Sequence, residues 1–129
     1  MIVHVPVSVA ELIDKITILD IKLERMTDPG QLKNVQYEYQ LLCEQLVQLE
    51  LTGLDHLMQD LRHINQLIWD VENFKRTCEA RQCFDDQFVE AARNVYQYND
   101  RRAAVKRAIN QQVGSTIREE KSHVLTIVN

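Results

Sequence analysis

The sequence predicts an all-α protein, an antiparallel four-helix bundle with short strand-like segments at its N- and C-terminal ends. The 129 residues include only three Gly and two Pro, and so few helix breakers favour long helices. Apolar residues also recur at alternating steps of three and four, the spacing of helix faces that pack on other helices. A chain of this length builds one core, so we expect a single domain over residues 1–129.

The first two helices are delimited by capping signals. Ser8 and Glu11 form an S-x-x-E capping box at the start of the first helix. Asp28-Pro29-Gly30 ends that helix and opens the second, which Thr52-Gly53 ends. So short a connection predicts two antiparallel helices. Their apolar faces consist of Val9, Leu12, Ile16, Leu19, Leu23 and Met26, and of Leu32, Val35, Tyr39, Leu42, Leu46 and Leu49.

Two longer helices follow. The third is expected from about Leu54, where Thr52 and Asp55 can cap it, to about Gln82. The fourth is expected over residues 86–113, with Asp85 as its N-cap and Gly114 as its end. A short helical piece after Ser115 is expected to hold Glu119, Glu120 and Lys121.

The two ends of the chain carry β-branched runs. Residues 2–7 (IVHVPV) and 124–128 (VLTIV) are strand candidates. A lone two-stranded ribbon is marginally stable in water, so if these runs pair they must also lie on the helices or on a second copy of the protein.

Composition excludes several function classes. A net charge of −4 and a pI near 5.5 argue against binding to a phosphate backbone, so we expect no nucleic-acid partner. The start lacks a basic n-region and an apolar h-region, and no window is long enough to cross a membrane. We therefore expect a cytoplasmic protein without membrane insertion. Cys43, Cys78 and Cys83 lack zinc-ligand spacing, fit a reducing compartment and are interpreted as small buried or half-buried hydrophobes.

Polar groups interrupt the apolar face of the fourth helix. Arg102 lies near the middle of that face, and its polar companions are Asn99, Lys106 and Asn110. The third helix repeats the pattern with Lys75. An unpaired buried cation costs several kcal/mol, so these groups must meet carboxylates, line a wet cavity or bind an anion. The carboxylates expected within reach are Glu72, Glu79 and Asp20.

Two interpretations of these groups stay open. In the first, they form an internal ion-pair network that fixes helix register. In the second, Arg102 and Lys106 hold a carboxylate or phosphate in a pocket between helices. An enzymatic version of that pocket would use Glu72 as its acid or base. The candidate ligand-binding residues are Lys75, Glu72, Asn99, Arg102, Lys106 and Asn110.

Other candidates are weaker. His56, Asp60 and His63 share one face of the third helix and could hold a divalent metal, but no fourth ligand and no H-E-x-x-H motif accompanies them, so we favour a solvated face and no metal. No Gly-rich phosphate loop and no nucleophile with an adjacent base is present, so no catalytic residue is assigned and no cofactor is expected. Ile18 and Ile21, on the back of the first helix, are either scattered surface residues or a homodimer seam.

Three stretches resemble a family of small bacterial helical proteins defined only as a domain of unknown function. They are the first helix (VSVAELIDKITILDIKLERM), LIWDVENFKR, and NVYQYNDRRAAVKRAIN with the later EEKS. The resemblance covers most of the chain, and it implies a pathway but no reaction, because relatives are often encoded beside genes for surface polysaccharide or glycosyl transfer. The motif positions are Glu11, Asp14, Lys15, Trp69, Glu72, Asn99, Asp100, Arg102, Lys106, Asn110, Glu120 and Lys121.

A second, partial similarity is to the helical chorismate mutases, whose dimeric bundle binds a dicarboxylate with buried cations. The first helix offers Lys15, Lys22 and Arg25, but the second helix has no matching Arg series. The similarity therefore implies an analogy in chemistry and not common descent.

The sequence favours a non-enzymatic interaction or accessory module, a homodimer that can also meet a protein partner. The resemblance alone links it to cell-surface glycan synthesis. The alternative is a binding protein or enzyme for a small anionic metabolite in a pocket between helices. The two hypotheses differ in whether protein carboxylates or an open pocket face the charged ends of Arg102 and Lys106.

Overall fold

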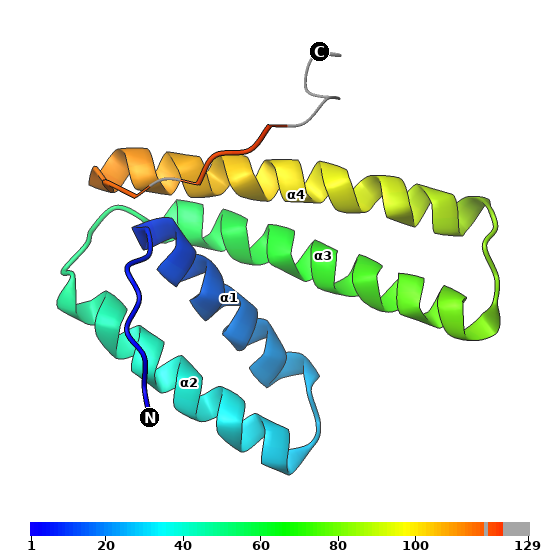
Figure 1. Ribbon diagram of the computed structural model, residues 1–129, viewed down its shortest axis with the longest axis horizontal. Coiled ribbons are helices and arrows are strands. Elements are labelled where there is room, and N and C mark those ends of the chain that lie inside the picture. The colour runs from blue at the N-terminus through cyan, green and yellow to red at the C-terminus, as the bar shows by residue number, and fades with distance from the viewer. Residues whose placement is uncertain (118, 123–129) are drawn as a thin grey trace.

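The computed structural model describes residues 1–117 and 119–122, and the described chain contains helices and no strand (Figure 1). This confirms the all-α class and the four-helix bundle. The helices are α1 (Val9–Arg25), α2 (Pro29–Gln48), α3 (Asp55–Arg81) and α4 (Asp86–Val113).

Two antiparallel hairpins build the bundle. α3 and α4 lie side by side along their length, and the α1–α2 hairpin crosses them near the end where α3 begins and α4 ends (Figure 1). α1 packs on all three other helices, whereas α2 packs on α1 alone among the described helices. The far half of the α3–α4 hairpin therefore extends beyond α1.

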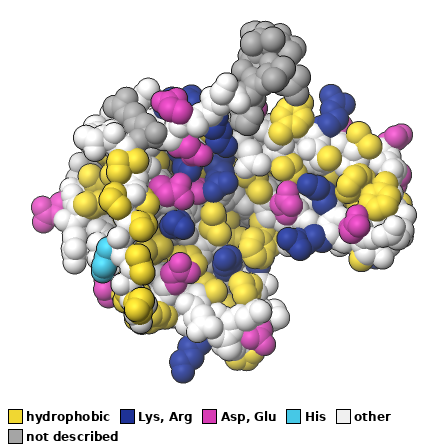
Figure 2. Space-filling view, in the orientation of Figure 1, with side chains coloured by type: hydrophobic (Ala, Val, Ile, Leu, Met, Phe, Trp, Pro, Cys, Tyr) yellow, Lys and Arg dark blue, Asp and Glu magenta, His cyan; other side chains and the backbone are white. Residues whose placement is uncertain are grey.

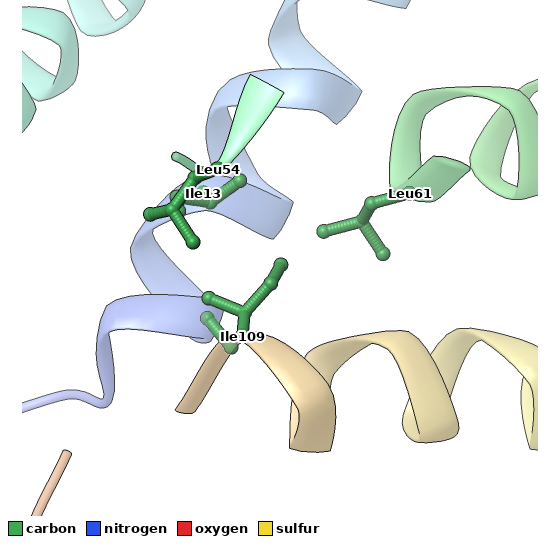
Figure 3. Packing of buried hydrophobic residues seen from close by; sticks show 5 residues of the cluster. Ile13, Leu54, Leu61 and Ile109 are labelled. Carbon is green, nitrogen blue, oxygen red and sulfur yellow. The ribbon is translucent and has the colours of Figure 1, made fainter. Parts of the chain in front are cut away.

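The core lies where the starts of α1 and α3 meet the end of α4. Ile13, Leu61 and Ile109 are fully buried there and point toward one another, with Leu54 beside them (Figure 3). Full burial of such an aliphatic side chain contributes about 1.5–3 kcal/mol. This cluster fixes the start of α1 against α4, which is also where the polar groups of the two helices meet.

Three of the four helices begin at the expected capping residues. The Ser8 hydroxyl accepts the Glu11 N–H, and the Asp28 and Asp85 carboxylates accept backbone N–H groups of α2 and α4. The capping prediction for α3 was wrong, because Leu54 occupies the N-cap position and makes no side-chain cap bond. Burial of Leu54 in the core secures that end instead.

Two predicted elements at the chain ends are absent from the described residues. Residues 2–7 were predicted as a strand, but they form none because no second strand lies beside them in the described chain. Residues 115–117 and 119–122 were predicted to include a helical piece and are not helical. After Gly114, the Ser115 N–H bonds the Asn110 carbonyl, which turns the chain back over α4. The run 124–128 lies outside the described residues.

α1 is buried on two faces, which overturns one expectation about its back. Ile21 is only 2% exposed and Ile18 is half-buried, so Ile21 is not available for a homodimer seam. Ala10 and Thr17 share its side of the helix and bond to residues of α4 and α3. The side that looked solvent-facing is therefore covered by the α3–α4 hairpin.

None of the four helices is both long and apolar enough to span a membrane; this finding covers only the part of the chain that is described.

Candidate functional site

An ion pair between α1 and α4 is the centre of the site. The Arg102 Nε donates to Asp14 Oδ1 at 3.0 Å, and Arg102 Nη2 donates to Asp14 Oδ2. The two bonds form the bidentate fork that guanidinium and carboxylate groups favour. The Asp14 side chain is only 1% exposed, so the pair holds a carboxylate in the protein interior.

Asn65 of α3 completes the surroundings of that carboxylate. Its Nδ2 donates to Asp14 Oδ1 at 2.9 Å and to Thr17 Oγ1 at 2.8 Å, and the Thr17 hydroxyl donates to the Asp14 carbonyl at 2.8 Å. Every buried side-chain nitrogen and oxygen of the described residues has a hydrogen-bond partner. The Asp14 network is therefore satisfied internally, as buried polar groups require.

Lys106 lies one turn further along α4 and is paired twice. Its Nζ is 2.7 Å from Glu11 Oε2 on α1 and 2.9 Å from Glu119 Oε2 on the segment after α4. The Lys106 side chain is only 8% exposed. One further turn along, Asn110 Oδ1 accepts the backbone N–H of Ala10 at 2.9 Å.

These three contacts form what we call the α1–α4 ladder. Arg102, Lys106 and Asn110 are spaced by four residues on α4, so they share one face of that helix. Their partners on α1 are met in reverse order, as antiparallel helices demand. The contacts are Asp14 with Arg102, Glu11 with Lys106, and Ala10 with Asn110.

The ladder changes the pKa values of its members. Burial alone would raise the pKa of Asp14, but hydrogen bonds from Arg102 and Asn65, with the nearby cationic charges, bring it below its usual value. Burial alone would lower the pKa of Lys106, and its bonds to the two glutamates instead raise it. The hydrogen bond from Lys106 lowers the pKa of Glu119. Asp14, Lys106 and Glu119 therefore remain ionised at neutral pH.

The carboxylates that sequence reasoning selected do not face the α4 cations. Glu72 Oε1 lies 3.5 Å from the Lys75 Nζ on the same helix. Asp20 Oδ2 accepts a hydrogen bond from the Arg62 Nε at 2.5 Å. The expectation that one of the selected carboxylates lies within reach is confirmed for Lys75, which pairs with Glu72, and was wrong for Arg102 and Lys106. α1, which supplies the real partners, packs on both longer helices near their other end, where α3 begins and α4 ends.

Of the six candidate ligand-binding residues, the structure brings three together. Arg102, Lys106 and Asn110 form one side of the ladder. Lys75 and Glu72 pair with each other, and half-buried Asn99 is not a member of the ladder.

The motif positions divide in the same way. Glu11 and Asp14 belong to the ladder, and Trp69 is half-buried on α3. The remaining motif positions are exposed; they are Lys15, Asp100, Glu120 and Lys121.

Sequence reasoning missed Asn65, Thr17 and Glu119 as members of the site. Thr17 carried a signal, because it recurs with Ala10, Ile13 and Ile21 at helical spacing on one face of α1. Glu119 carried none, since its place depends on how the chain turns after α4.

The weak metal candidate is not assembled. His56 Nε2 lies 3.4 Å from Asp60 Oδ2, and His56 and His63 are exposed. Within the described residues, no group of three or more His, Cys, Asp or Glu side chains could hold a metal ion.

A cavity of about 250 Å³ adjoins the ladder between α4 and the segment after it. Lys106, Asn110 and Glu119 belong to both the cavity wall and the network around the ladder. Figure 2 shows acidic and basic side chains side by side in this region. The remaining wall residues are Ala103, Arg107, Gln111, Glu120 and Lys121.

A family model described as a family of unknown function (DUF6165) matches residues 3–129. The chain belongs to this family. The match agrees with the resemblance to a domain of unknown function, and DUF6165 carries no assigned activity in that description. No curated protein and no solved structure matches the chain.

For this DUF6165 chain, replacing Arg102 by Met should lower the free energy of unfolding by about 3–5 kcal/mol, because a buried carboxylate loses its cation. Urea unfolding followed by circular dichroism measures the change. Arg93→Met, at an exposed position of the same helix, should stay within about 0.5 kcal/mol of the wild type. Adding Asp14→Leu to Arg102→Met should recover most of the loss, and a double variant no more stable than Arg102→Met would contradict the pairing.

Acid should weaken the DUF6165 chain through Asp14. Its folded pKa is below the unfolded value, so the stability it contributes is complete above the unfolded pKa of about 3.9 and is lost as pH falls toward the folded pKa. In Arg102→Met, burial without the cation favours the protonated carboxyl, so the gap in unfolding free energy between that variant and the wild type should narrow as pH falls from about 6 to 3. Urea titrations of both proteins across this pH range measure the difference in unfolding free energy. A difference that does not change with pH would contradict the prediction.

Proposed function

We propose that this chain is a non-enzymatic interaction module that works as a homodimer. The observation that carries the proposal is the N-terminal arm, residues 1–7, which leaves the start of α1 as a non-helical segment (Figure 1). All seven residues are exposed. Val3, Val5 and Val7 are 73%, 66% and 40% exposed and occupy alternate positions, so an extended arm presents them on one side.

α2 gives the proposal a second support. Val35 is the one buried residue among its twenty, and α1 is its only helical neighbour in the described chain. Tyr37, Val47 and Leu49 are exposed large hydrophobic residues on or directly after this helix. α2 is covered on one side only, and these large apolar side chains stand among its exposed polar residues, where a second protein can pack on them.

A second copy of the chain is the partner that fits these features most simply. In a two-fold dimer, both copies contribute the same surface patch to the interface. The arm and the exposed side of α2 would therefore each take part in the interface once from each copy. Two antiparallel arms alone would make only a marginal two-stranded ribbon. The exposed apolar side chains on and after α2 in each copy are available to support that ribbon.

The α1–α4 ladder also favours a module over an enzyme. Asp14 pairs with Arg102, and Glu11 and Glu119 pair with Lys106. This is the outcome expected of an internal network that fixes register, because the charged ends are used within the chain.

The setting of the module is part of the proposal. We place it in the bacterial cytoplasm, beside proteins of cell-surface glycan synthesis that would be its further partners. The support for this setting is the resemblance to relatives encoded near such genes.

The arm is tested by Val5→Asp, with His4→Asp as the matched control on the opposite side of an extended arm. Val5→Asp should shift the dimer to monomer at micromolar concentration, because a charge enters the apolar stripe, whereas His4→Asp should remain dimeric. Size-exclusion chromatography with light scattering gives the mass, and circular dichroism should show the same helicity in all three proteins. A monomeric wild type, or equal masses for both variants, would refute the proposal.

The cavity beside the ladder favours a second candidate function, the binding of a small anion. Lys106, Arg107 and Lys121 supply cations to its wall, and the Glu119 carboxylate already occupies Lys106. An external dianion could contact several of these cations at once, whereas the Glu119 carboxylate bonds only Lys106 among them. We therefore expect such a dianion to displace Glu119 from Lys106.

Removing the internal carboxylate tests this second candidate. Glu119→Gln should bind inorganic phosphate about tenfold more tightly than the wild type, because the competing charge is gone. Glu120→Gln is the matched control, and adding Lys106→Met to Glu119→Gln should abolish the gain. Calorimetry and amide chemical shifts near Asn110 report binding. Absence of saturable binding in Glu119→Gln, or an equal gain in Glu120→Gln, would remove this candidate.

A further inference from the structure

The turn between α3 and α4 brings the backbones of two cysteines close together. Gln82 adopts the left-handed conformation (φ 53°, ψ 40°), and its N–H bonds the Glu79 carbonyl. The Cys83 N–H bonds the Cys78 carbonyl at 3.0 Å. These two bonds define a Schellman motif, which commonly places the side chains of its first and sixth residues in contact. Those residues are Cys78 and Cys83.

The backbone separation is compatible with a disulfide. With the Cys83 nitrogen 3.0 Å from the Cys78 oxygen and the carbonyl carbon trigonal, standard bond lengths keep the two Cα atoms within about 6.9 Å. Any bend brings them closer, and disulfides span about 4.4–6.8 Å between Cα atoms. The five-residue spacing that excludes a zinc pair therefore suits a covalent bond across the end of a helix.

The two thiols differ in access. Cys83 is exposed, and its Sγ lies 3.6 Å from Asp85 Oδ2, to which the thiol donates. Cys78 is buried, and burial raises the pKa of its thiol, with smaller contributions from Cys83 and Asp85. Cys83 is therefore the thiol that a reagent in solution meets first.

We propose that Cys78 and Cys83 are a reversible redox pair that exchanges with small-molecule disulfides of the glutathione class. Cys83 loses its proton to solvent, attacks one sulfur of the small disulfide and releases one small thiol, which leaves a mixed disulfide. Cys78 then loses its proton, attacks the Cys83 sulfur and expels the second small thiol. Two protein thiols are oxidised, and one small disulfide is reduced to two thiols.

Oxidation would act on the exposed end of the α3–α4 hairpin. The new bond would tie the last turn of α3 to the segment that leads directly into the Phe84–Phe88 pair, whose rings meet edge to face at 5.1 Å. Phe84 is exposed. The cysteine pair would therefore couple the redox state of the solution to the order of the α3–α4 turn, where Phe84 and Phe88 lie outside the bundle core.

The test uses the full chain in glutathione buffers of increasing oxidised fraction, with rapid alkylation of free thiols and mass spectrometry of peptides. The wild type should lose two hydrogen atoms between Cys78 and Cys83 and regain them with reduced glutathione. Cys43→Ser is the matched control and should behave identically. Cys78→Ser should instead accumulate glutathione on Cys83, and Cys83→Ser should form neither product.

A comparison with the unfolded chain shows whether the fold, and not only the short distance in sequence, favours the disulfide between Cys78 and Cys83. The equilibrium constant for closing the disulfide should be at least about tenfold larger in the folded protein than in urea, because the Schellman turn holds the backbones of the two cysteines close together. An equal constant in urea, or a wild type that accumulates the mixed disulfide as Cys78→Ser does, would overturn the proposal. A wild type that stays reduced while Cys78→Ser takes up glutathione would do the same.

Discussion

The buried pairing of Asp14 with Arg102 is the constraint on which the arrangement of the two hairpins depends. An unpaired carboxylate at 1% exposure would be costly, so α1 is stable only where the guanidinium and the Asn65 amide both reach it. Apolar contacts alone would let α1 slide along the groove between α3 and α4, because aliphatic side chains tolerate several registers. The ladder removes that freedom, since its three contacts coincide in one register only.

The same constraint explains how the polar residues are divided between structure and surface. The α4 polar residues that face α1 form ion pairs and hydrogen bonds within the chain. Exposed large apolar residues lie elsewhere, on the N-terminal arm, on α2 and at the α3–α4 turn. A fixed core with apolar surface at its periphery suits a scaffold that presents contacts to other proteins. The cavity beside Lys106 is the exception, because there the core network is open to the C-terminal segment.

Local signals in the sequence were sufficient for the helices and insufficient for their partners. Caps at Ser8, Asp28 and Asp85 act within a few residues, so they could be recognised directly. The pairing of Asp14 with Arg102 joins positions 88 residues apart, and helical spacing cannot say which face of a second helix a polar group meets. α1 made this harder because both of its sides are buried, and the side holding Asp14 resembled a solvated one. The ladder was therefore foreseen on α4 and missed on α1.

The long sequence separation across the ladder also sets an order of events in folding. Each hairpin is built from neighbouring segments and can form early, whereas the ladder contacts join residues 88 to 100 positions apart. On the ribosome, Asp14 emerges long before the arginine that will neutralise it, and it remains hydrated until α4 has left the exit tunnel. Docking of α1 therefore waits for α4, so synthesis must pass Asn110 before the N-terminal hairpin is secured.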